Sequence, residues 1–275
     1  MSDRPLLVGA VAYTANVVPI WEGIRDYFDG SAAGMDFVLF SNYGRQVDAL
    51  LDGVIDIAWN TNLAWVRTHL RTGGACRALA MRDTDLTFAT VLVSRPGAGL
   101  RDIGDLKGRR LALGSRDSAQ AAILPVHFLT QAGLRNGDGD GEVELLRIDS
   151  DLGKHGDTGR SELDAIRAVL DDRADAAAIG ITTWDAIGRD ELMPGALAEF
   201  WRSPQYCHCN FTALDSVPES RAAPWVEHLL AMSWDNPAHR QILELEGLRR
   251  WVRPQLDGYA SLFDAVKSQG IPPRW

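Results

Sequence analysis

The chain has 275 residues, of which 46% are hydrophobic and 24% are charged, an ordinary composition for a folded protein with a sizeable core. Its formal net charge of −9 disfavours non-specific binding to nucleic acid or to an anionic membrane surface. A small anionic ligand is still compatible with this charge, because a local pocket can oppose the global sign. We therefore expect a small-molecule partner and neither a nucleic-acid nor a membrane partner.

The first residues are typical of a buried strand rather than of a secretory leader. The apolar run LLVGAVAY (6–13) is short, and the polar residues Thr14 and Asn16 come directly after it. A leader needs a basic segment, a continuous apolar run and a small-residue cleavage site. The chain also has no uninterrupted apolar run of about 18 residues, as a membrane span would need, and three cysteines suit a reducing compartment. These features predict a cytoplasmic protein.

Strand-like and helix-like segments alternate along the first third of the chain. Segment 17–28 carries apolar side chains at helical spacing, and Gly53 is a plausible helix stop. The predicted strands are 6–13, 35–40, 54–59, 75–82 and 87–94. This alternation predicts a mostly parallel sheet covered by helices.

A second α/β unit comes next in the chain. Its predicted helices are 118–134 and 161–175, and its later predicted strands are 143–148 and 176–181. The chain from Pro218 onward is predicted to be mainly helical. We therefore predict two lobes. Residues 1–90 and about 205–275 form lobe 1, about 91–204 form lobe 2, and the protein is a monomer or a homodimer.

Four segments together resemble the type II periplasmic-binding-protein fold, in particular the phosphonate/phosphite-binding family. They are VDALLDGVIDIAWNTN (47–62), LRDIGDLKGRRLALGSRDSAQAAILPVHFLTQAG (100–133), WRSPQYCHCNFTALDSVPE (201–219) and ILELEGLRRWVRPQLDGYASL (242–262). The resemblance implies an α/β fold of two lobes, with helices on both faces of each sheet and a ligand cleft between lobes that close like a hinge. It also implies a cytoplasmic solute-binding-fold protein that binds a small anionic solute, phosphonate- or carboxylate-like.

The opening VGAVAYTANVVPIWEGI (8–24) is similar to that of the cytoplasmic chorismate dehydratases, with one extra residue between Tyr13 and Asn16. This resemblance implies an alternative function, a cofactor-independent lyase (dehydratase or decarboxylase) acting on a cyclic or aromatic carboxylate. His208 and Tyr13 are then the chief candidates for its acid or base. The chain contains no G-x-S-x-G, H-E-x-x-H, Walker or G-x-G-x-x-G motif, and we expect no cofactor.

Ligands of open α/β sheets bind beyond the carboxyl ends of the strands. In lobe 1 this rule selects polar and aromatic residues that follow predicted strands: Tyr13, Asn16, Tyr43, Trp59, Asn60 and Thr61. Alternatively, Asn60 or Thr61 caps the helix that begins after them.

In lobe 2 the same rule selects the loop of Ser115, Arg116, Asp117 and Ser118. Hydroxyls and free backbone N–H groups at a helix start can hold an anion, and an arginine can add a bidentate contact. Asp117 or Ser118 could instead be a plain helix cap, and Arg116 could point to solvent. The resembled family has hydroxyl side chains at the matching place, whereas this chain has Ala119 and Gln120 after Ser118.

Two further lobe 2 candidates are His155, in a glycine-bearing loop, and Thr182, directly after a predicted strand.

The cluster Cys207-His208-Cys209 combines three residue types that can bind metal or do chemistry. The chain lacks a second C-x-x-C or H-x-x-x-H to complete four ligands, so we expect no metal site. In an extended segment Cys207 and Cys209 share one face and His208 lies on the other. Either His208 faces the ligand, which we favour, or Cys207, Cys209 or Asn210 does.

Overall fold

The computed structural model describes residues 4–139, 141–154, 160–189 and 195–274. Its described residues form two compact units. Unit 1 comprises 4–87, 206–260 and 272–274, and unit 2 comprises 88–205 and 261–271. The segment 261–271 therefore belongs to unit 2, whereas the sequence pattern predicts it in lobe 1. Its last helix buries Leu262 and Val266, and Gln269 Nε2 donates to the carbonyl oxygen of Ile123 at 2.8 Å.

Unit 1 is built on a sheet of strand order β11-β4-β10-β3-β1-β2 among the described residues. Its elements are β1 (Leu6–Val11), α1 (Val17–Phe28), β2 (Met35–Phe40), α2 (Tyr43–Leu51), β3 (Ile57–Asn60), α3 (Asn62–Thr72), β4 (Cys76–Arg82), the 3-10 turn η1 (Asp83–Asp85), β10 (Asn210–Leu214), α7 (Glu219–Leu230), α8 (Pro237–Glu246), β11 (Trp251–Val252) and the 3-10 turn η4 (Leu256–Tyr259).

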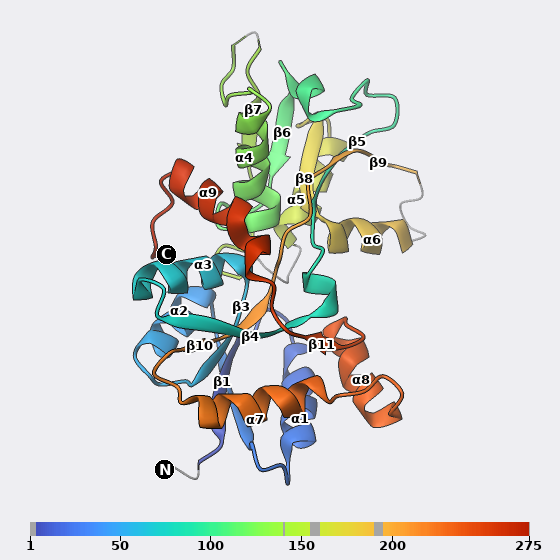
Figure 1. Cartoon of the computed structure of the whole chain (residues 1–275). Coiled ribbons are helices and arrows are strands. Elements are labelled where there is room, and N and C mark those ends of the chain that lie inside the picture. The colour runs from blue at the N-terminus through green and yellow to red at the C-terminus, as the bar shows by residue number, and fades with distance from the viewer. Residues whose placement is uncertain (1–3, 140, 155–159, 190–194, 275) are drawn as a thin grey trace. The chain divides into compact units, whose positions relative to one another are not determined.

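The strands of unit 1 that come first in the chain are parallel, as the alternating pattern predicts. β1 pairs in parallel with both β2 and β3, whereas β10 is antiparallel to its neighbours β3 and β4. In Figure 1 this orange strand lies among the strands of the first third of the chain. Residues far apart in sequence are thereby brought together in the middle of the sheet.

Apolar helix faces cover both sides of the unit 1 sheet. Val17, Ile24 and Trp225, from α1 and α7, belong to one core cluster, and α2 and α3 contribute Tyr43 and Ala64 to another. Gly9 in β1 permits this packing, because a Cβ there would come within 2.4 Å of Ile55 Cδ1.

Unit 2 has a sheet of strand order β7-β6-β8-β5-β9 among the described residues. Its elements are β5 (Thr90–Ser94), the 3-10 turn η2 (Ile103–Leu106), β6 (Arg110–Leu113), the π-helical turn η3 (Ala119–Ile123), α4 (Leu124–Gln131), β7 (Glu144–Arg147), α5 (Arg160–Leu170), β8 (Ala176–Gly180), α6 (Ile181–Arg189), β9 (Ala198–Arg202) and α9 (Ala260–Ser268).

β6 pairs in parallel with β7 and β8, and β5 is antiparallel to its neighbours β8 and β9. The strand β8, AAAIG, is wholly buried and apolar, and the helical elements α5, α6 and η3 contact it. Buried polar side chains follow the end of β6, at Ser115, Asp117 and Ser118. We call this segment the β6 loop. Among the described residues, no helix is long and apolar enough to cross a bilayer.

Candidate functional site

The loop that follows β6 begins with a buried serine that holds a buried carboxylate. The Ser115 hydroxyl donates to Asp151 Oδ1, and the backbone N–H of Ser161, at the start of α5, donates to Asp151 Oδ2 at 3.2 Å. Ser115 is fully buried, and Asp151 lies just beyond the end of β7. At the carboxyl ends of these strands, a hydroxyl donor and an N–H donor are therefore arranged around one oxyanion. That oxyanion is the carboxylate of Asp151, which belongs to the chain itself.

The other residues of this loop also have partners within unit 2. Arg116 is exposed, and its Nε donates to Asp149 Oδ2 at 2.9 Å. That hydrogen bond is the main reason that the pKa of Asp149 lies below its usual value. Asp117 accepts a hydrogen bond from the backbone N–H of Gly153 at 2.8 Å, and Ser118 is the N-cap of η3. The capping alternative thus describes Ser118.

A second buried carboxyl group, Glu162, lies at the start of α5 near the end of β8. It accepts hydrogen bonds from Gln120 Nε2 at 3.0 Å and from the backbone N–H of Gly180 at 2.8 Å. Burial raises its pKa, and hydrogen bonds from Thr183, Gly180 and Gln120 oppose that shift. Glu162 and Asp151 are not among the candidates predicted from the sequence, and Gln120 is noted there only as a departure from the hydroxyl pattern of the family.

The remaining lobe 2 candidates are Thr182 and His155. Thr182 is exposed in the first turn of α6, next to Thr183. His155 lies outside the described residues.

In unit 1 the candidates around β3 are buried and used internally. Thr61 caps α3 by accepting from the Ala64 N–H at 3.3 Å, as the capping alternative predicts. Trp59 is buried in the core, with its ring centroid 4.6 Å from that of Phe211. Tyr43 is buried in the core cluster between α2 and α3.

The two candidates nearest the N-terminus differ in burial. Tyr13 is partly buried against the core of unit 1. Asn16 is exposed at the N-cap position of α1, but its side chain makes no capping hydrogen bond.

Asn60 belongs to a chain of buried polar side chains that crosses the sheet edge of unit 1. Its Nδ2 donates to Thr212 Oγ1 at 3.0 Å, and Thr212 donates in turn to Asn210 Oδ1 at 2.7 Å. Asn210 Nδ2 donates to the Tyr259 hydroxyl at 2.9 Å, and that hydroxyl donates to the carbonyl oxygen of His208 at 3.2 Å. Three residues named from the sequence, Asn60, Asn210 and His208, are thus connected through Thr212 and Tyr259.

Residues 207–209 do not have the two-faced strand geometry that the sequence suggests. β10 begins only at Asn210, and 207–209 have no regular secondary structure. His208 Nδ1 lies 3.1 Å from Cys209 Sγ, and Cys207, His208 and Cys209 are all buried. Because these two side-chain atoms lie so close together, His208 and Cys209 do not point to opposite faces, and the prediction of opposite faces is wrong.

His208 also contacts a buried ion pair. Its Nδ1 lies 3.3 Å from Asp85 Oδ1, and Arg82 binds the same carboxylate through Nε at 2.6 Å and Nη2 at 3.0 Å. Burial acts to raise the pKa of Asp85, but the Arg82 charge and hydrogen bonds from His208 and Arg82 lower it to about 2. Glu246 Oε1 is 3.4 Å from Arg82 Nη1. We call Arg82, Asp85, His208, Cys209 and Glu246 the Arg82 cluster.

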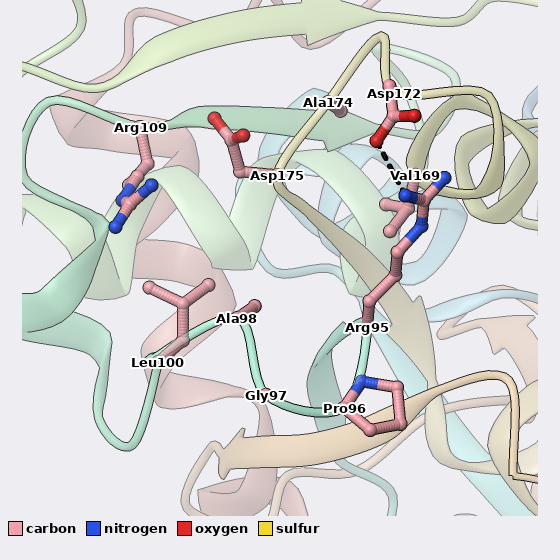
Figure 2. Close-up of a pocket in the computed structure, with 10 residues that line it drawn as sticks. All are labelled: Arg95, Pro96, Gly97, Ala98, Leu100, Arg109, Val169, Asp172, Ala174 and Asp175. Atoms are coloured by element: carbon pink, nitrogen blue, oxygen red, sulfur yellow. Dashed lines mark hydrogen bonds and ion pairs between the residues drawn. The ribbon is translucent and has the colours of Figure 1, made fainter.

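A hollow of about 300 Å³ opens on unit 2 at the opposite edge of its sheet from the β6 loop. Figure 2 shows the Arg95–Asp172 ion pair on one side of it and Arg109 and Leu100 on the other. Asp175, which also lines it, pairs with Arg110 at 3.2 Å. None of the described residues that were selected from the sequence lines this hollow.

The whole chain resembles solved structures of solute-binding proteins. PhnD1 of Prochlorococcus marinus (MIT 9301), in complex with methylphosphonate, matches with a TM-score of 0.73 and 20% identity, covering 98% of this chain and 99% of that one. The aliphatic sulphonate binding protein SsuA of Escherichia coli matches with a TM-score of 0.61 and 17% identity, covering 99% and 81%. These likenesses define the class: the fold is that of the type II periplasmic binding proteins.

Sequence comparison gives the family. The profile of the family described as ABC transporter, phosphonate, periplasmic substrate-binding protein matches residues 13–259. The chain is also 24% identical over 232 residues to the probable ABC transporter phosphite binding protein PhnD1 of Prochlorococcus marinus (strain MIT 9301), covering 80% of this chain and 74% of the relative. The chain belongs to this family of periplasmic substrate-binding proteins, as the resemblance of its four segments implies.

The prediction of a cytoplasmic protein is wrong. The matched family consists of periplasmic substrate-binding proteins of ABC transporters, and the curated relative is a binding protein of that kind. The composition of the first residues, on which the prediction rested, is a weaker guide to the compartment than membership of a transport family. The relatives are named for binding, and the lyase alternative gains no support from them.

Proposed function

We propose that this chain is the solute receptor of an ABC transporter and that it binds a small anion at the β6 loop and the start of α5. The observation that carries this proposal is the arrangement around Asp151. A buried hydroxyl, that of Ser115, and a helix N-terminal N–H group, that of Ser161, converge on one carboxylate. Such donors hold oxyanions in general, whether carboxylate or phosphonate.

The charged groups near the β6 loop limit the net charge that a bound anion can carry. Asp117, Asp151 and Glu162 are all buried there, and Arg116 is already paired with Asp149. A doubly charged anion would meet strong repulsion from three buried carboxyl groups, since like charges interact strongly at low dielectric. We therefore favour a singly charged ligand, a carboxylate or a singly protonated phosphonate, that also carries hydrogen-bond donors.

The named ligands of the relatives provide the first compounds to test. Methylphosphonate is the ligand in the PhnD1 complex, phosphite is named for the curated relative, and aliphatic sulphonate is named for SsuA. Each is a small tetrahedral anion, and each differs in charge or in its capacity to be protonated near neutral pH.

Calorimetric titration with phosphite, methylphosphonate, a short alkanesulfonate and a short monocarboxylate would test the proposal. We expect at least one of these anions to bind with 1:1 stoichiometry. Ser115→Ala should weaken that binding at least tenfold, because an anion that takes the place of Asp151 at the Ser115 hydroxyl then loses a charge-assisted hydrogen bond, which contributes about 1.5–3 kcal/mol.

Ser150→Ala provides the matched control. Ser150 is an exposed serine near the same loop, and its hydroxyl donates to Asp164 at 2.6 Å. Its removal should leave the affinity unchanged. Equal affinities for the wild type and Ser115→Ala would contradict the role of the β6 loop, and binding of none of these anions would contradict the proposed ligand class.

A further inference from the structure

Three side chains of the Arg82 cluster have the composition of a metal site. Asp85, His208 and Cys209 offer a carboxylate oxygen, an imidazole nitrogen and a thiol sulfur, and these atoms all lie within 4.8 Å of one another. The side chains of Asp85 and His208 are each 1% exposed, and Cys209 is fully buried. The group combines three different ligand types, each of which occurs once.

Two of the three distances between the ligand atoms are close to those of a tetrahedral zinc site. His208 Nδ1 is 3.1 Å from Cys209 Sγ and 3.3 Å from Asp85 Oδ1. With ordinary Zn–N, Zn–S and Zn–O bond lengths, tetrahedral angles require separations of about 3.5 Å and about 3.4 Å, respectively. For these two pairs, a bound ion requires an outward movement of a few tenths of an ångström, and the Asp85 oxygen and Cys209 Sγ lie within 4.8 Å of each other.

The fold explains why neighbouring residues can converge here. His208 and Cys209 lie just before β10, where the chain has no regular secondary structure. The backbone N–H of His208 donates to the carbonyl oxygen of Asp85 at 2.9 Å, which fixes the distance between this segment and η1. Because this hydrogen bond joins backbone atoms, the two segments stay side by side whatever the side chains bind.

The surrounding charges are compatible with a divalent cation. Arg82 binds both oxygens of Asp85, as outer-shell groups commonly do for ligating carboxylates. Glu246 lies beside Arg82 and is largely buried, and its carboxylate offsets the guanidinium charge. With the Asp85 carboxylate and a Cys209 thiolate as ligands, a divalent ion brings the cluster to neutrality.

We propose that Asp85, His208 and Cys209 bind one Zn²⁺ ion. Zinc is chosen because it accepts nitrogen, sulfur and oxygen ligands and imposes no geometry of its own. The ion would join η1 to the segment before β10 within unit 1. The three ligands are buried, so the ion enters while the chain folds, and its binding free energy adds to that of folding.

The experiment is to refold the full chain with Zn²⁺ or with a chelator and to measure bound metal and melting temperature without any solute. We expect about one equivalent of Zn²⁺ per chain and a higher melting temperature with zinc. Co²⁺ in place of Zn²⁺ should give a thiolate-to-cobalt absorption band. Cys209→Ser should abolish that band and weaken zinc binding at least tenfold.

Cys207→Ser is the matched control, because Cys207 is a buried thiol two residues away whose Sγ lies 3.2 Å from the Gln255 carbonyl oxygen, outside the ligand group. It should keep both the metal and the cobalt band. A wild-type chain that stays metal-free after refolding with Zn²⁺ would overturn the proposal, as would loss of the cobalt band in Cys207→Ser alone. Anion binding plays no part in this test, so the outcome is independent of the proposed solute.

Discussion

The β6 loop of unit 2 and the Arg82 cluster of unit 1 both contain an arginine that binds an aspartate, but the two pairs differ in burial. The Arg82 and Asp85 side chains are 15% and 1% exposed, whereas those of Arg116 and Asp149 are 66% and 26% exposed. When one partner of an exposed pair is removed, water solvates the charge that remains. When one partner of a buried pair is removed, the remaining charge is left buried without compensation. Burial, rather than the identity of the residues, therefore decides how much unfolding free energy is lost when one partner of each pair is removed.

The largest expected effect comes from breaking the buried pair. Arg82→Met should lower the free energy of unfolding by about 3–5 kcal/mol, because Asp85 and Glu246 then remain buried without the guanidinium. Arg116→Met, the matched substitution in unit 2, should cost at most about 1 kcal/mol. Urea denaturation with a chelator present measures both without any contribution from zinc. Similar losses in the two variants would show that burial does not separate the two pairs.

A smaller effect should follow from cutting the buried polar chain of unit 1. Thr212→Val keeps the shape of the side chain but removes the partner of both Asn60 and Asn210, which are fully buried. We expect a loss of about 2 kcal/mol in unfolding free energy. Thr130→Val is the control, since the Thr130 hydroxyl lies on an exposed helix position in unit 2 and donates to Val126. A neutral Thr212→Val would mean that water replaces the missing hydroxyl.

The smallest effect concerns the pH dependence of unit 2. Burial raises the pKa of Glu162 above its ordinary value of 4.5, so the folded chain holds this proton more tightly than the unfolded chain does. Its stabilising contribution is complete below pH 4.5 and is lost as the pH rises through the folded-state pKa. Glu162→Gln should remove that decline, which is at most about 1.4 kcal/mol per pH unit.

Denaturation midpoints measured between pH 4 and pH 8 would give the slope of the unfolding free energy against pH. Glu244→Gln, on an exposed position of α8, provides the control substitution. A wild-type slope that persists in Glu162→Gln would assign the pH dependence to other groups.

The fold could be predicted well because its signals are local. Buried strands such as LLVGAV and AAAIG are apolar throughout, and the alternation with amphipathic helices indicates an α/β fold. Membership of the binding-protein family was also accessible, because the matching segments extend over most of the chain. The assignment of 261–271 was not, since it depends on contacts of α9 with residues far away in sequence.

The candidate site was harder to predict, because a polar side chain after a strand can serve the fold as well as a ligand. Asn60 and Thr61 satisfy the rule of strand ends, yet one joins a buried polar chain and the other caps a helix. Asp151 satisfies the same rule after β7, and that signal was available in the sequence. The contact between Asp85 and His208 had no sequence signal, because only the return of the chain through β10 brings the two segments together.

Gly258 lies so close to Cys207 that a Cβ there would come within 2.2 Å of Cys207 Sγ. The Cys207 thiol is thus enclosed by backbone, and burial raises its pKa to about 11, so a thiol reagent meets neither an open path nor a thiolate. Alkylation must therefore wait for a local opening of the chain. The labelling rate of Cys207 would therefore report how often that opening occurs. Any ligand that tightens unit 1 should lower this labelling rate.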